Sequence, residues 1–191
     1  MSNESTTDKS RDAHVLAADA AGSRDRDLGK GINYALIYGA GDPRLGSLVG
    51  GGAADGERIR AKLYQLIPGL ERLIRGSKTA AQRGHVLGLD GRKFYIRSVK
   101  GSPLNTVIQG GGSLFMKRTA VILDRLLADL PFHKVVDMHD EAQWEIPDTQ
   151  ESRKQFEDAV LQAFKQGTEY YELRCPQEPD VKFGYTWAET H

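Results

Sequence analysis

Four residues suited to binding an anionic, ring-containing ligand recur at four-residue intervals: Arg26, Lys30, Tyr34 and Tyr38. Four residues advance about 400° around an α-helix, so each step drifts by only about 40° and the side chains form one stripe. Arg26 and Lys30 repel each other unless an anion lies between them, and a polyphosphate would suit this helix end. The rings could stack on the base or sugar of the same ligand. In the alternative, the cations form a solvated edge, and Tyr34 and Tyr38 lie in the core.

A second candidate site is the tripeptide His139-Asp140-Glu141, which lies between the segments VVDM and AQWEI. Adjacent acidic residues at a hairpin turn present one carboxylate on each face of the strand ribbon. Magnesium normally takes one or two protein carboxylates and completes its shell with water and substrate phosphates, so Asp140 is a candidate ligand. A polar hairpin turn that binds no metal would be satisfied by the same three residues.

A third candidate site combines two amides, three glycines and a basic segment. Asn105 and Gln109 lie one turn apart on a predicted helix, and their amides could donate to base or sugar acceptors, although such surface pairs often have no function. Glycines at 110–112 cost about 1 kcal/mol each relative to alanine, so either a nucleic-acid backbone or a neighbouring helix approaches there. The preceding basic segment, which is either a phosphate-binding ribbon or a solvated face, consists of Arg92, Lys93, Arg97 and Lys100.

The composition limits the classes of protein to which the chain can belong. The 191 residues carry 26 Lys+Arg and 26 Asp+Glu, so any binding of nucleic acid must come from local clusters. No apolar run approaches the roughly 20 residues of a membrane-spanning helix, and the first residues lack the apolar segment of a secretory signal, so a cytoplasmic location is expected. The single cysteine, Cys175, cannot form an internal disulfide and is expected to be an inert, partly buried thiol.

Hydrophobic spacing predicts mainly helices, followed by a mixed layer of strands and helices. Strand alternation is predicted around the Asp90-Gly91 turn and across 133–146. This order indicates the α+β class, and residues 1–12 are predicted to be a mobile polar tail. The predicted helices cover 14–21, 24–38, 45–49, 57–75 with a break at Pro68, 104–130 and 150–170.

Taken in this order, the segments resemble the C-terminal part of a family A DNA polymerase, most closely the phage replicative type. RDLGKGINYALIYGAGD resembles the fingers motif of that family, motif B, and VVDMHDEAQWEI resembles motif C of the palm. GLDGRK followed by LNTVIQGGG resembles the segment between them. The resemblance runs from about Asp12 to His191. It implies a right-hand polymerase fold, with helical fingers at 13–78 and part of an antiparallel-sheet palm with flanking helices at 79–191.

The resemblance implies that the stripe binds the incoming deoxynucleoside triphosphate (dNTP). Arg26 and Lys30 would grip the triphosphate, and Lys30 would also protonate the pyrophosphate leaving group. Tyr34 would lie against the sugar and base, at the position where a Tyr rather than a Phe tolerates dideoxynucleotides in this family. Tyr38 would help to close the templating pocket, and His14 stands where a histidine of the family touches the phosphates.

The resemblance also assigns roles to the other two candidate sites. Asp140 would be the catalytic metal ligand, and His139 and Glu141 would support the primer end. Asn105 and Gln109 would contact the minor groove of the duplex, beside phosphate contacts from the basic residues Arg92, Lys93 and Arg97. Many family members have an Arg four residues before that Asn, whereas this chain has Gly101, so one duplex contact is missing.

The chain departs from the family pattern by lacking motif A, with its DxSxxExR pattern, as well as the thumb and the 3′–5′ exonuclease. Two-metal phosphoryl transfer needs carboxylates from two places to hold two ions about 3.5–4 Å apart. The sequence therefore predicts the C-terminal subunit or fragment of a template-directed DNA polymerase, which binds primer-template DNA, dNTP and Mg²⁺. A separate N-terminal polymerase chain would supply the second carboxylate, and the isolated chain would be inactive. The alternative is a non-catalytic nucleotide- or DNA-binding remnant of such a polymerase.

Overall fold

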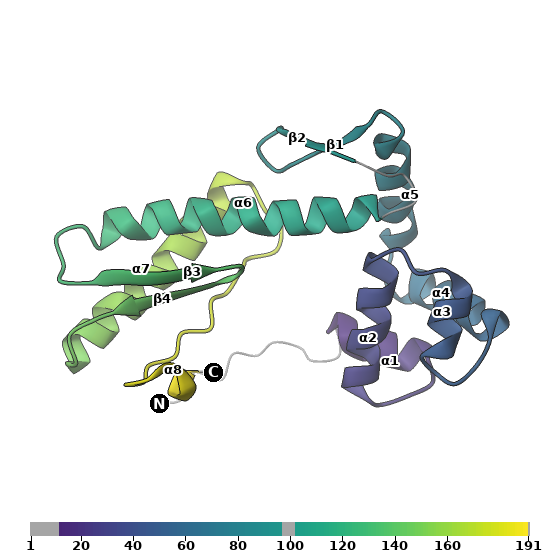
Figure 1. The fold of residues 1–191 in the computed structure, drawn as a ribbon, viewed down its shortest axis with the longest axis horizontal. Coiled ribbons are helices and arrows are strands. Elements are labelled where there is room, and N and C mark those ends of the chain that lie inside the picture. Colours follow the sequence, from purple (N-terminus) through teal and green to yellow (C-terminus); the bar gives the residue numbers. More distant parts are fainter. Residues whose placement is uncertain (1–11, 97–101, 191) are drawn as a thin grey trace. The chain divides into compact units, whose positions relative to one another are not determined.

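The structure, a computed structural model, describes residues 12–96 and 102–190, and the chain divides into two compact units. The first unit comprises Met1–Leu87 and Lys93–Ile108, and the second comprises Gly88–Arg92 and Gln109–His191. Helix α6 (Pro103–Leu126) begins in the first unit and continues in the second. Helices are combined with two small antiparallel sheets, which confirms the predicted α+β class (Figure 1).

The first unit contains a cluster of helices that follow one another closely in the sequence. The break predicted at Pro68 separates two helices. Gly69, with a left-handed φ of 90°, is the N-cap residue directly before the second of them. The third helix begins at Asp42, three residues before the predicted start, because Pro43 fits the first turn of a helix. The helices are α1 (Ala13–Ala20), α2 (Arg26–Ile37), α3 (Asp42–Ser47), α4 (Ala53–Leu66) and α5 (Leu70–Ala81) (Figure 1).

Glycines allow pairs of these helices to approach each other closely. A Cβ on Gly29 of α2 would collide with the carbonyl oxygen of His14 in α1 and lie 2.9 Å from the backbone nitrogen of Ala18. A Cβ on Gly56 of α4 would collide in the same way with the carbonyl oxygen of Asp42 in α3. The absence of side chains at these positions therefore sets both helix spacings. The main core cluster of this unit consists of Ala17, Ala20, Ile32, Leu36, Leu45, Ile59, Leu63, Ile74 and Leu104.

A short hairpin follows α5 and consists of β1 (His85–Leu87) and β2 (Lys93–Tyr95). The two strands are antiparallel, with His85 opposite Tyr95, and the backbone N–H of Gly88 donates to the carbonyl oxygen of Arg92 at 2.9 Å. The hairpin turn predicted from Asp90-Gly91 is therefore confirmed. The predicted continuation of the strand to Ser98 lies outside the described residues.

The second unit packs a hairpin and a helix against the later part of α6 (Figure 1). The predicted end of α6 at Leu130 is wrong, because the helix ends at Leu126 and a turn precedes Pro131, whose ring disfavours helical geometry in the residue before it. The apolar pattern continues past the helix because Leu127 is buried in the core. The further elements are β3 (His133–Met138), β4 (Glu141–Glu145), α7 (Gln150–Tyr170) and α8 (Trp187–Thr190), and the core consists of Leu123, Leu127, Phe132, Ala159, Val160 and Ala163.

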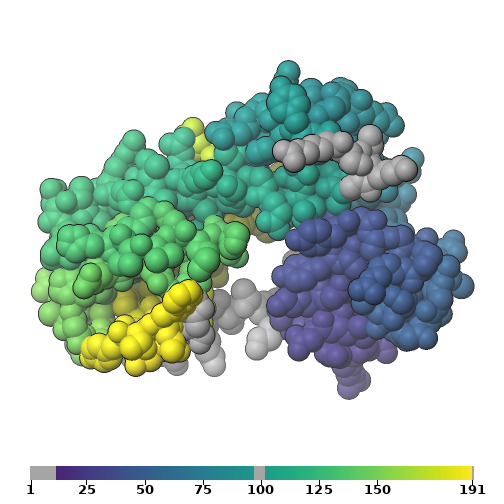
Figure 2. Space-filling model, in the orientation of Figure 1, coloured from purple at the N-terminus to yellow at the C-terminus, as the bar shows by residue number. Residues whose placement is uncertain are grey.

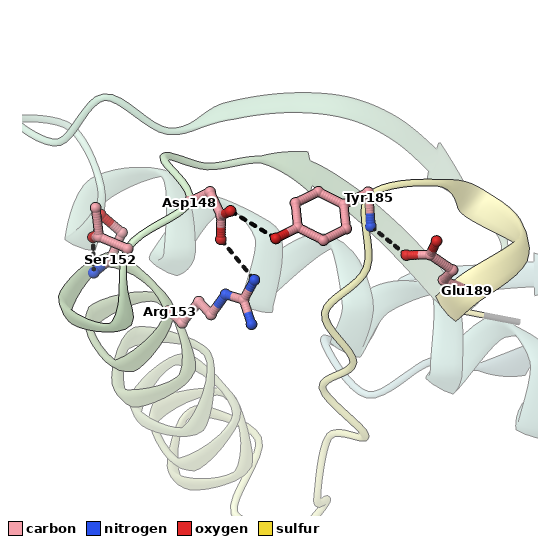
Figure 3. A network of polar contacts seen from close by, with 6 residues as sticks. Asp148, Ser152, Arg153, Tyr185 and Glu189 are labelled. Carbon is pink, nitrogen blue, oxygen red and sulfur yellow. Dashed lines mark hydrogen bonds and ion pairs between the residues drawn. The ribbon is translucent and has the colours of Figure 1, made fainter.

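The C-terminal segment is attached to the start of α7 by polar contacts (Figure 3). The Tyr185 hydroxyl donates to one oxygen of Asp148 at 2.8 Å, and Arg153 donates to the other at 2.6 Å. The Glu189 carboxylate accepts the backbone N–H of Tyr185 at 2.6 Å. The hydrogen bond from Tyr185, supported by Arg153, lowers the pKa of Asp148, and the same bond raises the pKa of Tyr185. Figure 2 shows the yellow C-terminal residues lying against the green surface of the same unit.

Two expectations from the composition can be compared with the structure. None of the helices in the described part of the chain has the length and apolar character that crossing a membrane would require. Cys175 is exposed, so the expectation of a partly buried thiol is wrong. The residue lies in the irregular segment between α7 and α8, where few side chains can cover it.

The close crossing of α1 and α2 leads to a prediction about stability. Gly29→Ala should lower the free energy of unfolding by about 2–3 kcal/mol, because the added methyl group meets the backbone of α1. Gly31→Ala on the same helix is the matched control, since its Cβ would meet nothing within 4 Å and alanine favours the helix by about 1 kcal/mol. Urea denaturation followed by circular dichroism measures both. Equal stabilities of the two variants would contradict the close crossing.

The C-terminal contacts lead to a prediction about pH. Because the pKa of Asp148 is lowered, its stabilising effect is present above its ordinary value of 3.8 and disappears as the pH falls below it. The pKa of Tyr185 is raised, so its effect is present below its ordinary value of 10.0 and disappears above it. At pH 8, Tyr185→Phe should therefore accelerate tryptic cleavage after Lys182. Tyr170→Phe, which changes another exposed tyrosine, should be cleaved at the wild-type rate, and equal rates for both variants would contradict this role of the Tyr185 hydroxyl.

Candidate functional site

The predicted stripe lies on the exposed side of α2. Arg26 begins the helix, Lys30 and Tyr34 follow at successive turns, and Tyr38 is the C-cap residue. The side chains of Tyr34 and Tyr38 are 48 % and 59 % exposed, so the alternative that places both rings in the core is wrong. The buried face of the helix consists of Gly29, Ile32, Asn33 and Leu36. Two cations and two rings therefore share a solvent-facing surface.

The histidine expected near the stripe is held there by a buried amide. Asn33 Nδ2 donates to the carbonyl oxygen of Ala13 at 2.6 Å and lies 3.1 Å from Nδ1 of His14. The His14 ring packs edge-on against Tyr34, with 6.1 Å between centroids. The structure thus places His14 beside a ring of the stripe, and its expected contact with the phosphates stays a prediction. Sequence reasoning missed Asn33, although a polar residue on an otherwise apolar helix face is the signal that could have found it.

The two cations of the stripe differ in their surroundings. Lys30 Nζ lies 5.9 Å from the centroid of the Tyr34 ring, and within the described ranges it makes no ion pair. Arg26 instead pairs with Asp12, whose Oδ2 lies 2.9 Å from both Nε and Nη2 of the guanidinium. The predicted repulsion between Arg26 and Lys30 is therefore relieved by a carboxylate of the chain itself.

Asp12 also caps the first helix, so the predicted boundary of the mobile tail at residue 12 is wrong for this residue. Its Oδ1 accepts the backbone N–H of His14 at 2.7 Å, as an N-cap side chain does. This hydrogen bond lowers the pKa of Asp12, and the hydrogen bond and charge of Arg26 lower it further. Burial of the carboxyl acts in the opposite direction without reversing the shift. Residues 1–11 lie outside the described part of the chain.

The N-terminus of α2 is capped by a carboxylate rather than open to a phosphate. The side chain of Asp25 accepts the backbone N–H of Asp27 at 2.9 Å. An anion at this helix end would meet negative charge, so the backbone N–H groups are a poor phosphate site. Any triphosphate bound by α2 must therefore rely on the side chains of Arg26 and Lys30.

The predicted metal ligand lies at the turn of the second hairpin. His139 and Asp140 form the turn between β3 and β4, and His139 has a left-handed φ of 58°. Asp140 is exposed, and Gln143 donates to the neighbouring Glu141 carboxylate at 3.0 Å. Within residues 12–96 and 102–190, no group of three or more His, Cys, Asp or Glu side chains could hold a metal ion. The exposed Asp140 carboxylate fits magnesium as one ligand, and the second carboxylate must come from elsewhere.

The two predicted duplex-contacting amides lie on α6. Asn105 is half-buried, and its Oδ1 atom has no hydrogen-bond partner in the described part of the chain. Gln109, one turn later, is exposed. A Cβ on Gly111 would lie 3.7 Å from the side chain of Leu89, and one on Gly112 would meet nothing within 4 Å. The described residues thus provide no neighbouring helix that would explain the glycines at these two positions.

The predicted basic ribbon is only partly described. Arg92 lies 2.7 Å from the Asp90 carboxylate in the turn of the first hairpin, whereas Lys93 is exposed and has no ion pair within the described ranges. Arg97 and Lys100 lie outside the described residues. The phosphate contacts assigned to Arg92, Lys93 and Arg97 therefore stay predictions.

Comparison with known proteins identifies the family. The model of the family described as DNA polymerase family A matches residues 7–189. The chain belongs to DNA polymerase family A. The DNA-directed DNA polymerase of Escherichia phage Phieco32 is 35 % identical over 190 residues, which cover 94 % of this chain and 30 % of the phage protein. The corresponding enzyme of Escherichia phage T7 is 28 % identical over 94 % of this chain and 29 % of its own length.

A solved structure supports the fold. The POL domain of Pol1 from M. smegmatis, in complex with DNA primer-template and dNTP, matches 80 % of this chain and 31 % of that chain with a TM-score of 0.67 and 19 % identity. The predicted polymerase fold portion is therefore confirmed. The present chain spans only about 30 % of the length of its relative from phage Phieco32. The boundary between fingers and palm at 78/79 stays a prediction, since the two compact units divide elsewhere.

Proposed function

We propose that this chain forms the C-terminal part of a template-directed DNA polymerase and works in the cytoplasm of a bacterium or a phage-infected host. It binds the incoming dNTP on α2 and supplies Asp140 to a magnesium site for nucleotidyl transfer. The observation that carries the proposal is the exposed stripe of α2, in which Lys30 lies beside the half-exposed Tyr34 ring and has no ion pair among the described residues. Membership of family A supports the reaction class.

The stripe offers separate contacts to the parts of a nucleotide. Lys30 and Arg26 provide charge-assisted hydrogen bonds to phosphate oxygens, and His14 lies beside them through its contact with Tyr34. The Tyr34 ring presents an apolar face to the sugar and base, and Tyr38 lies one turn further along, where the templating base would pair. Lys30 would donate a proton to the pyrophosphate as it leaves.

In the proposed reaction, the 3′-hydroxyl of the primer loses its proton and attacks the α-phosphorus of the dNTP, and pyrophosphate leaves. Magnesium, when bound, would stabilise the charge that develops on the phosphoryl oxygens. Asp140 supplies one carboxylate, and the flanking residues His139, in the same turn, and Glu141, at the start of β4, support the primer end. The second carboxylate comes from a separate N-terminal chain that carries motif A, so the isolated chain is inactive.

Primer-template DNA is the remaining partner in this proposal. Asn105 and Gln109 contact the minor groove from α6, where their side-chain amides donate to base or sugar acceptors. Arg92, Lys93 and Arg97 contact phosphates of the duplex. The open space beside Gly112 leaves room for a nucleic-acid backbone.

Primer extension tests the metal assignment. We expect magnesium-dependent extension only when this chain is mixed with an N-terminal polymerase chain that carries motif A. Asp140→Ala should slow extension by the mixture roughly 10³-fold, because a metal ligand that stabilises the transition state is lost. Asp158→Ala, which removes an exposed carboxylate from α7, is the matched control. Wild-type rates with Asp140→Ala would contradict the assignment.

Nucleotide binding tests the stripe independently of catalysis. Lys30→Ala should weaken the binding of dATP to the full chain about tenfold in equilibrium dialysis, because a charge-assisted contact to phosphate is lost. Lys78→Ala on α5 removes an exposed lysine without an ion pair in the described structure and should leave the affinity unchanged. Equal affinities of the Lys30→Ala variant and the wild type would show that the stripe does not bind the triphosphate.

A non-catalytic nucleotide- or DNA-binding remnant is the second candidate. It is favoured by the observation that the described residues contain no complete set of metal ligands. Nucleotide binding that depends on Lys30, together with no extension in any mixture and no association between the chains, would identify this function.

A further inference from the structure

The Arg26 guanidinium is already engaged by an anion of the protein. Asp12 Oδ2 lies 2.9 Å from both Nε and Nη2, so one carboxylate oxygen occupies the edge of the guanidinium where these two donors meet. Phosphate oxygens bind arginine through the same edge and with the same geometry, because both anions present oxygens to paired N–H donors. The carboxylate therefore occupies a position that a triphosphate oxygen would take.

We propose that Asp12 competes with the nucleotide for Arg26, so that a triphosphate binds fully to the stripe only after Arg26 has exchanged the Asp12 carboxylate for a phosphate. The proposal rests on the proposed dNTP-binding function of α2 and adds to it a residue that sets the affinity and the ligand preference of that site.

The geometry determines which partner moves. The second oxygen of Asp12 accepts the N–H of His14 and caps α1, so the carboxylate cannot leave without giving up the cap. The Arg26 side chain is 57 % exposed, whereas that of Asp12 is 29 % exposed. Arg26 therefore swings to the ligand, and Asp12 stays in place.

The arrangement of charges favours highly charged ligands. Lys30 has no ion pair within the described ranges and can receive a phosphate without competition, whereas Arg26 is available only in exchange for Asp12. Asp25 and Asp27 add further negative charge at the same helix end. A triphosphate carries enough charge to engage Lys30 and displace Asp12 from Arg26, while a monophosphate binds to Lys30 alone.

Removing the charge of Asp12 without removing its cap tests the proposal. Asn caps helices about as well as Asp, so Asp12→Asn should preserve α1 while losing the ion pair. We expect this variant to bind inorganic tripolyphosphate and dATP about two- to fivefold more tightly than the wild type, since exposed ion pairs are weak. Binding of dAMP should change less. Isothermal titration of the full chain in EDTA measures all three ligands.

Asp19→Asn on the same helix is the matched control. It changes the net charge of the chain by the same amount, and the exposed Asp19 side chain has no hydrogen bond or ion pair in the described part of the chain, where Lys62 binds the backbone oxygen of Asp19. Its affinity for tripolyphosphate should equal that of the wild type. If circular dichroism shows that Asp12→Asn is unfolded, Asp12→Ser, which introduces another neutral capping residue, takes its place and should show the same tighter binding of tripolyphosphate.

A double-mutant cycle separates competition at Arg26 from a general effect of charge. In an Arg26→Ala background, Asp12→Asn should no longer raise the affinity for tripolyphosphate. An equal gain in that background, or unchanged or weaker binding by Asp12→Asn in the otherwise wild-type chain, would overturn the proposal. If neither the wild type nor Asp12→Asn bound tripolyphosphate, the proposed nucleotide site would fail and the competition with it. A wild type that binds in a Lys30-dependent way, without any effect of Asp12→Asn, would remove only the competition.

Discussion

The close crossing of α1 and α2 determines what α2 presents to solvent. Gly29 removes the side chain at the point of closest approach, and Asn33, one turn later, places a buried amide against the backbone of α1. A buried amide without a partner costs about 1–3 kcal/mol, so Asn33 is tolerated only because Ala13 supplies an acceptor. With Gly29 and Asn33 turned toward α1, the helical period leaves the residues at 26, 30, 34 and 38 on the accessible side.

The second hairpin is fixed at its base and free at its turn. Lys134 on β3 lies 3.0 Å from Asp137 and 3.7 Å from Asp124 of α6, and its ammonium group lies 5.6 Å from the centre of the Trp144 ring. Trp144 in turn packs with the core of the second unit. The opposite end of the ribbon carries Asp140 into solvent. The turn therefore presents the Asp140 carboxylate to solvent, next to the exposed Glu141 at the start of β4.

Local patterns in the sequence predicted most of the helices, but contacts between distant residues had no local signal. The helix over 150–170 has the predicted bounds, because its apolar spacing and the Thr149 cap lie within one segment. The end of α6 was misjudged, since Leu127 continues the apolar pattern as a core residue outside the helix. The pair of Arg26 with Asp12 spans 14 positions, and that of Tyr185 with Asp148 spans 37, so neither follows from helical or strand periodicity.

The distribution of ion pairs explains how a chain with no net charge can present cations to phosphate. Of the cations assigned to phosphate contacts, Arg26 and Arg92 each pair with an aspartate, whereas Lys30 and Lys93 have no ion pair within the described ranges. A planar guanidinium matches a carboxylate as well as it matches a phosphate, so the arginines find partners within the chain. In the proposed function, the lysines are then the cations that an incoming phosphate meets first. In the proposed competition, Arg26 becomes a second contact only by exchanging its aspartate for a phosphate, and exchange between two anions of similar geometry costs little.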